Sequence, residues 1–256
     1  AGIFGHPIAD IYQSSEIAAV DVLRGPSSVI YGTNAMGGVI NITTKKSQHE
    51  GLKFFTDVNY GSFDSYKIKG SIDFKKNKFT NKISISKDYS NDNRPSSSYN
   101  SISGIYNSSY LINNFWSIDF NTFINSTKSF NPGPVTKPYK NDSVWTDVTR
   151  ANLSLAIKNR YENHEGSILF FFNNGVHDIF DGFHSNDNTF GLIINESIEF
   201  IDKSLITFGA DIKRYGGSAR NKVQLIDKSV TERALFIIVN KSLFNKISLN
   251  GGLRLN

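Results

Sequence analysis

The chain lacks cysteine and contains only one methionine, two tryptophans and six prolines among its 256 residues. Without cysteine, this sequence can form neither a disulfide framework nor a metal site with thiolate ligands. It also lacks any run of about 18 apolar residues, which excludes a transmembrane helix. No signal peptide is visible, since the sequence opens directly with Ala1-Gly2-Ile3-Phe4-Gly5, and we expect the natural N-terminus to be missing.

Charge of either sign is moderate, with 28 Lys and Arg against 23 Asp and Glu and a formal net charge of +5. The basic residues are scattered and form no single patch, which argues against nucleic-acid binding. The excess is compatible with an ordinary mildly basic surface or with anionic lipid headgroups as partners. Aromatic residues are abundant, with 20 Phe and 11 Tyr, which argues against disorder and is typical of strands and membrane interfaces.

The first 48 residues predict a small αβ unit. An apolar strand is expected over Ile17–Leu23, and Gly25 and Pro26 end it. Pro26 can begin one helical turn through 27–31, because its missing N–H costs nothing in a first turn. A glycine-rich loop and a second strand over Val39–Thr44 complete the unit, and a polar linker follows.

From about residue 50 the chain alternates apolar and polar residues. Leu52–Tyr60 and Tyr66–Phe74 each place apolar side chains on one face and Lys, Asp, Ser or Asn on the other. The pattern returns in 116–125, 151–157 and 206–213. Strands of soluble sandwiches usually run about five or six residues, whereas about ten residues cross a bilayer. We therefore expect about eleven membrane-spanning strands after residue 50.

The connections between these strands predict a polarity. Short turns are expected around 75–78, 112–114, 161–164, 202–203 and 244–245, and mostly longer loops at 61–65, 90–98, 127–147, 175–188 and 215–230. Short turns on one side and long loops on the other are typical of outer-membrane barrels, with the long loops outside. Near the expected outer strand ends lie four tyrosines that would suit an aromatic girdle: Tyr60, Tyr66, Tyr89 and Tyr99.

Eleven strands cannot close a bacterial single-chain barrel, which has an even strand number. An open strand edge in lipid would leave backbone groups without partners. We therefore expect the chain to be truncated at both ends, with about half of a plugged barrel of about 22 strands.

A resemblance to a known family rests on Val22-Leu23-Arg24-Gly25-Pro26-Ser27-Ser28-Val29-Ile30-Tyr31-Gly32, followed by Asn34–Ile42. This stretch resembles the final plug motif of TonB-dependent outer-membrane receptors. Gly5–Asp10 resembles the preceding plug loop in receptors of the Bacteroides type, and 208–217 and 251–254 are similar to their barrel strands. The resemblance implies a mainly β fold: residues 1–48 would be the C-terminal part of the plug domain. Residues 49–256 would be the first half of a transmembrane antiparallel β-barrel.

The resemblance also implies a function without covalent chemistry or cofactor. Such receptors import a scarce, large nutrient across the bacterial outer membrane, among its lipid and lipopolysaccharide, with energy from the TonB–ExbB–ExbD complex. A ferric siderophore or haem is the expected cargo, with cobalamin or a glycan as alternatives. A surface adhesin or phage-docking barrel without transport is a rival, and a soluble all-β binding domain is another.

Arg24 is the candidate for holding the plug, because a charge in a polar lumen normally finds partners such as wall carboxylates. The alternative is a solvated turn arginine. The other candidate residues of the plug motif serve backbone geometry or the motif itself: Gly25, Pro26, Tyr31, Gly32, Gly37, Gly38 and Asn41. The sequence lacks the Gly-Lys-Ser/Thr ending of a phosphate loop.

Candidate ligand contacts lie in the expected external loops. His177, Asp178, Asp181 and His184 could hold a transition metal or haem, although their spacing matches no standard metal site and a merely polar loop is the alternative. His6 in the plug loop could face the ligand. Tyr139 and Trp145 in the longest loop could stack on a planar ligand.

We predict that Arg24→Ala loosens the plug in the full-length protein, because the guanidinium would no longer bond the wall. Small solutes should then leak through the barrel, as measured by solute permeability of reconstituted vesicles. Unchanged permeability would contradict a docking role for Arg24.

Overall fold

The computed structural model describes residues 17–24, 29, 38–45, 47, 49–139, 141–200, 204–221, 224–243 and 247–256. Strands in this part of the chain form two separate antiparallel sheets, one of two strands and one of eleven. No helix among these residues is long and apolar enough to span a membrane.

The two-stranded sheet confirms both strands expected in the N-terminal unit. It pairs β1 (Ile17–Arg24) with β2 (Gly38–Thr44), with Arg24 opposite Gly38. Gly38 has a φ of +134°, and a Cβ there would lie 2.4 Å from the Leu23 carbonyl oxygen, so the position requires glycine. The helical turn expected at 27–31 lies outside the described residues except for Val29.

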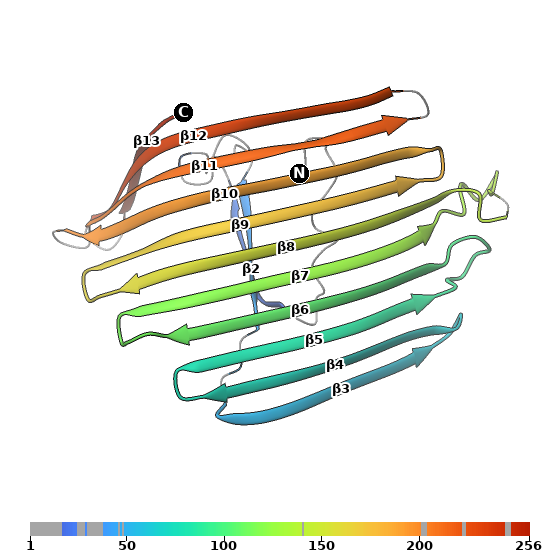
Figure 1. Ribbon diagram of the computed structural model, residues 1–256, viewed down its shortest axis with the longest axis horizontal. Helices are drawn as coiled ribbons and strands as arrows, with labels where there is room; N and C mark the ends of the chain where they lie inside the picture. Colours follow the sequence, from blue (N-terminus) through green and yellow to red (C-terminus); the bar gives the residue numbers. More distant parts are fainter. Residues whose placement is uncertain are drawn as a thin grey trace.

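The large sheet confirms the eleven strands expected after residue 50. Its members are β3 (Gly51–Gly61), β4 (Ser65–Lys76), β5 (Phe79–Ser90), β6 (Tyr99–Leu111), β7 (Trp116–Phe130), β8 (Trp145–Arg160), β9 (His164–Ile179), β10 (Phe183–Glu199), β11 (Ser204–Asn221), β12 (Gln224–Leu243) and β13 (Ile247–Leu255). Each strand pairs with the next along the chain, and Figure 1 shows this meander running from β3 at one edge to β13 at the other.

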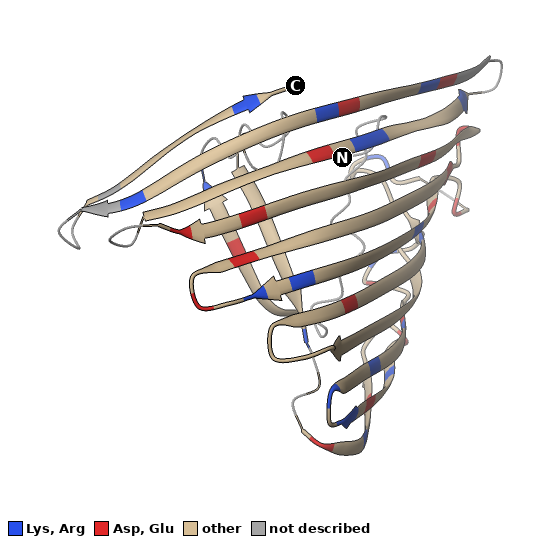
Figure 2. Cartoon of the chain, turned by 60° about the vertical axis from the view of Figure 1, so that its left-hand side comes forward, with Lys and Arg blue, Asp and Glu red and all other residues tan. Residues whose placement is uncertain are grey.

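The sheet is curved, and the β1–β2 hairpin lies on its concave side (Figure 2). A cavity of about 270 Å³ separates the hairpin from the wall; Ile17 and Ile42 line it on one side and Asn107 and Phe123 on the other. Curvature follows from the right-handed twist that accumulates between neighbouring strands. The concave face therefore forms the wall of a lumen that contains the hairpin.

The two faces of the sheet have an inverted distribution of polarity. On the convex face Phe54 is 71% exposed and Ile85 is 58% exposed, whereas on the concave face Ser84 and Ser86 are only 4% and 3% exposed. A water-soluble sheet buries its apolar face and exposes its polar one. Apolar side chains outside and polar ones inside are instead the arrangement of a transmembrane barrel wall.

The expected loop lengths are only partly right. Loops at 91–98 and 131–144 are the long connections among the described residues. The loops expected at 175–188 and 215–230 are wrong: β9 and β10 are joined by the turn 180–182, and β11 pairs with β12 as far as Asn221 opposite Gln224. In both segments polar residues break the strict alternation, while the backbone ladder continues.

The connections distinguish the two ends of the sheet. We call the end with 91–98 and 131–144 the loop end, and the end with 77–78, 112–115, 161–163 and 200–203 the turn end. The tyrosines of the expected girdle do lie toward the loop end, and the rings of Tyr66 and Tyr89 stack at 5.3 Å. Tyr99 departs from the expectation, because it lines a cavity on the concave face.

We predict that Ile85→Arg lowers the free energy of unfolding of the full-length protein in lipid vesicles by about 2–4 kcal/mol, the cost of an arginine at the bilayer midplane. Urea denaturation followed by tryptophan fluorescence measures this. Val135→Arg is the control, because Val135 is 82% exposed in the loop 131–144. Equal effects of the two variants would mean that the convex face does not contact lipid.

Candidate functional site

The candidate plug residues are only partly described. Arg24 ends β1 and is exposed, and Gly38 opposes it across the hairpin. The Asn41 side-chain amide donates a hydrogen bond to the Asp21 carboxylate at 3.3 Å, which links the two strands. The remaining candidates lie outside the described residues: His6, Gly25, Pro26, Tyr31, Gly32 and Gly37.

The four candidates between 177 and 184 do not form one constellation. They belong to the β9–β10 hairpin, and alternation sends neighbouring side chains to opposite faces. His184 Nδ1 and Asp178 Oδ1 are paired at 2.6 Å across the hairpin, while Asp181 Oδ1 accepts the Phe183 amide in the turn. His177 instead points to the concave face and is 3% exposed. No group of three or more His, Cys, Asp or Glu able to hold a metal occurs among the described residues.

His177 belongs to a buried polar cluster on the lumen wall, formed with Arg150, Ser185 and Asp187, all of them at most 5% exposed. Arg150 Nη2 lies 2.7 Å from His177 Nε2, and His177 Nδ1 lies 3.1 Å from the Ser185 hydroxyl. Because a guanidinium can only donate, Nε2 is the accepting nitrogen and Nδ1 carries the ring hydrogen. The three strands β8, β9 and β10 supply these residues.

Asp187 balances the charge of this cluster. Its Oδ1 lies 3.9 Å from Arg150 Nη1, and its Oδ2 lies 3.7 Å from His177 Nδ1. Gly175 leaves the space that these groups occupy, since a Cβ there would lie 2.8 Å from Arg150 Nη1. Arg150 Nε has no hydrogen-bond partner within the described part of the protein. A buried donor without a partner carries a free-energy cost, so the cluster stores unsatisfied polarity in the wall.

Arg150 also lines a cavity of about 460 Å³ at the loop end of the lumen wall. A second cation, Lys67, borders the cavity and pairs with Asp88 at 3.4 Å. The remaining wall consists largely of hydroxyl and amide groups, from Tyr99, Ser101, Asn125, Thr127, Ser129 and Thr146. Since each cation already has a carboxylate partner, the lining is polar with paired charges, which suits a polar, oxygen-rich ligand.

The loops above this cavity are joined to each other. Arg94 Nη2 donates to the Gly133 carbonyl at 2.9 Å, and the Asp142 amide donates to Ser96 Oγ at 3.2 Å. Tyr139 and Trp145, the candidates for stacking on a planar ligand, each have a neighbour in this region. The Tyr139 ring packs against Gly133, and Lys128 Nζ lies 4.9 Å above the Trp145 ring.

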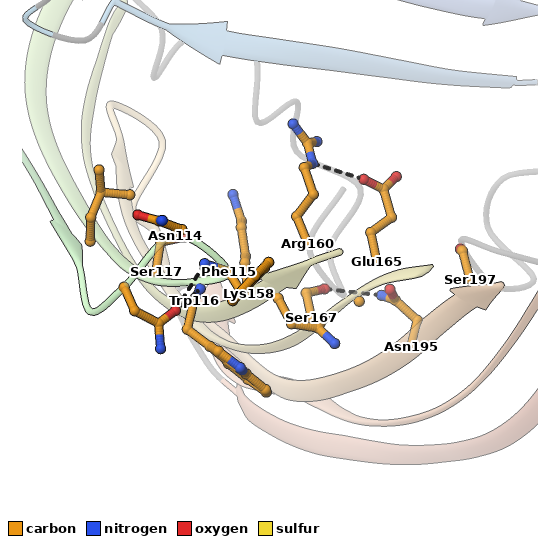
Figure 3. Close-up of a pocket in the computed structure, with 14 residues that line it drawn as sticks. Asn114, Phe115, Trp116, Ser117, Lys158, Arg160, Glu165, Ser167, Asn195 and Ser197 are labelled. Atoms are coloured by element: carbon orange, nitrogen blue, oxygen red, sulfur yellow. Dashed lines mark hydrogen bonds and ion pairs between the residues drawn. The ribbon is translucent and has the colours of Figure 1, made fainter. Parts of the chain in front are cut away.

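A second luminal cavity, of about 520 Å³, opens at the turn end (Figure 3). Its walls carry the exposed Arg160–Glu165 ion pair at 3.1 Å and the hydrogen bond from Asn195 to Ser167 at 3.2 Å. On its rim the Trp116 indole N–H donates to the Tyr161 hydroxyl at 2.8 Å. An aromatic rim at this end is typical of the second membrane interface.

Sequence reasoning missed Arg150, Lys67 and Asp187 as site residues. Each is one polar residue among many in an alternating strand, and only the register between strands brings them together. Arg150 did carry one signal: it is a charged residue in the middle of β8, and in the register it lies opposite Gly175.

We predict that Arg150→Met destabilises the full-length protein by about 3–5 kcal/mol, the cost of leaving a buried charge without its partner. Arg160→Met on the same strand is the control: its pair with Glu165 is exposed, and such pairs are worth about 0–1 kcal/mol. Urea unfolding in lipid vesicles measures both. Similar losses in the two variants would contradict a buried ionic cluster.

The chain resembles known proteins in short sequence segments and in its fold. No protein-family profile matches the chain. A 34-residue segment, 13% of this chain and 5% of the other, is 53% identical to the iron-regulated outer membrane virulence protein of Vibrio cholerae serotype O1. A 43-residue segment, 16% of this chain and 6% of the other, is 46% identical to the probable TonB-dependent siderophore receptor PirA of Acinetobacter baumannii.

Solved structures resemble nearly the whole chain. The siderophore receptor PirA from Pseudomonas aeruginosa matches 93% of this chain with a TM-score of 0.72 and 17% identity. The FrpB iron transporter from Neisseria meningitidis matches 94% with a TM-score of 0.78 and 13% identity. The chain covers only 43% and 46% of these proteins, less than half of each. In fold, the chain is therefore similar to part of the barrel of TonB-dependent siderophore receptors, as its sequence motif predicts.

Proposed function

We propose that this chain is part of an outer-membrane receptor that imports a scarce nutrient, with a ferric siderophore or haem as the cargo. The observation that carries the proposal is the inverted curved sheet: its apolar face points outward and its polar face encloses the β1–β2 hairpin. A wall of this kind needs lipid around it and a polar passage inside it. The likeness in fold to siderophore receptors supports the same function.

Each of the two expected domains has its own role. Residues 1–48 are the end of the plug and residues 49–256 the first half of the barrel. The protein acts as a transporter and not as an enzyme, since binding and displacement of the plug move the cargo without any covalent step. Energy comes from the TonB–ExbB–ExbD complex on the turn side, because the outer membrane has no energy source of its own.

The loop-end cavity is the proposed first contact for cargo. Ferric chelates are rich in oxygen, and the cavity offers hydroxyl and amide groups; Lys67, paired with Asp88, can turn to an anionic ligand. Lys67 is 32% exposed, so it can meet a ligand entering from outside. The loops 91–98 and 131–144 belong to the same end of the sheet and, being linked by Arg94, can order around the ligand together.

We predict that Lys67→Ala weakens binding of an anionic ferric chelate by the full-length protein roughly tenfold, since one charge-assisted hydrogen bond is worth about 1.5 kcal/mol or more. Lys76→Ala is the matched control, because Lys76 is exposed at the turn end of the same strand. Binding is measured by quenching of tryptophan fluorescence on titration with ferric chelates. Equal affinities of the two variants would remove Lys67 from the contact surface.

Uptake separates the proposal from its alternatives. Cells that depend on this receptor should accumulate labelled ferric chelate and stop when a protonophore removes the proton gradient. Accumulation of cobalamin or a glycan instead would change the cargo. Binding of cells or phage without any energy-dependent uptake would favour the adhesin or phage-docking barrel.

A further inference from the structure

An ion pair spans three strands of the lumen wall near its β13 edge. Arg254 on β13 donates two parallel hydrogen bonds to Asp211 on β11, from Nη1 at 2.7 Å and from Nη2 at 3.1 Å. Ala234 on β12 stands opposite Asp211 in the register, so the side chain between the partners is small. The side chains of Asp211 and Arg254 are only 1% and 6% exposed.

The guanidinium is held from several sides. Arg254 Nε donates to Asn256 Oδ1 at 2.7 Å, and Lys213 Nζ lies 3.7 Å from Asp211 Oδ1 as a second cation. Because these contacts fix the Arg254 guanidinium, its remaining N–H points in one direction, and a further hydrogen bond costs little conformational entropy.

That donor reaches the N-terminal unit. Arg254 Nη1 lies 3.3 Å from the carbonyl oxygen of Val29, a residue 225 positions earlier in the chain. The Val29 side chain packs at Gly252, where a Cβ would lie 3.0 Å from Val29 Cγ1 and equally close to the Ile237 carbonyl oxygen and Ile238 Cγ1 on β12. Arg254 thus binds the backbone carbonyl of Val29, and the Val29 side chain occupies the space beside Gly252.

We propose that Asp211, Arg254 and Gly252 form a docking site on the barrel wall for the plug segment at Val29. Arg254 supplies the bond, and Asp211 is a positioning residue that orients the guanidinium and balances its charge. Gly252, which has no side chain, leaves space for the side chain of Val29. The bond is directed at a backbone carbonyl, so it depends on where the segment lies and not on which side chain it carries.

The docking site has a consequence for transport, which rests on the proposed function. A plug held by hydrogen bonds to a rigid wall stays seated at rest, yet a directed pull can break those bonds one at a time. Weakening this site should therefore make the passage leak and should make the Val29 segment accessible before any ligand binds.

The test uses Val29→Cys in the full-length protein, since this chain has no cysteine that would react. In vesicles, a membrane-impermeant maleimide should label the introduced thiol roughly tenfold faster when Arg254 is changed to Lys, because an ammonium cannot bond Asp211 and the carbonyl with the same fork. Arg214→Lys is the matched control: Arg214 lies on β11, is exposed, and contacts Ser229. Labelling should be unchanged there.

A second measurement leaves the charges untouched. Gly252→Ala should displace Val29 and raise leakage of small solutes through vesicles, whereas Gly251→Ala should not, because a Cβ at Gly251 meets nothing within 4 Å. The docking site would be overturned if folded Arg254→Lys protein were labelled at the same rate as the protein with Arg254 intact. Equal leakage in the two glycine variants would overturn it as well. Faster labelling in a protein that imports no iron chelate would support the docking site and reject the proposed function.

Discussion

The structure depends on one constraint: every backbone N–H and C=O in the wall must be paired when the outer side of that wall is hydrocarbon. Between its two edge strands, the meander from β3 to β13 meets this constraint by bonding each strand to its sequence neighbour. Once the ladder is fixed, side chains alternate between lipid and lumen, and the polar face must therefore line the interior.

Because the interior face is polar, charged side chains lie on it and form ion pairs. Arg150 with Asp187 and Arg254 with Asp211 are buried pairs whose partners come from different strands, so each one links strands through side chains as well as through the backbone. Such pairs add little net stability compared with apolar packing, but they leave directed donors inside a wall. Arg150 lines the loop-end cavity, and Arg254 donates to the Val29 carbonyl.

Much of the fold was predictable from the sequence. The strict alternation in segments such as Leu52–Tyr60 predicts both the strands and the face that each side chain takes, because the side-chain period of a strand is two. The glycine-rich motif around Arg24 predicts the family whose solved structures the fold resembles. The outer turns of β9 to β12 were not predictable, since strands that rise above the lipid lose their apolar face and look like loops.

The candidate site was largely beyond the sequence. Residues 177–184 look like a cluster of ligands in the chain, yet the hairpin sends His177 inward, where it meets Arg150 from a neighbouring strand. The sequence by itself determined the strand periodicity, the apolar outer face and the glycine-rich motif, because these are local properties. Only the tertiary structure decided which charges meet, since that depends on the register between strands and on the curvature that brings Val29 to Arg254.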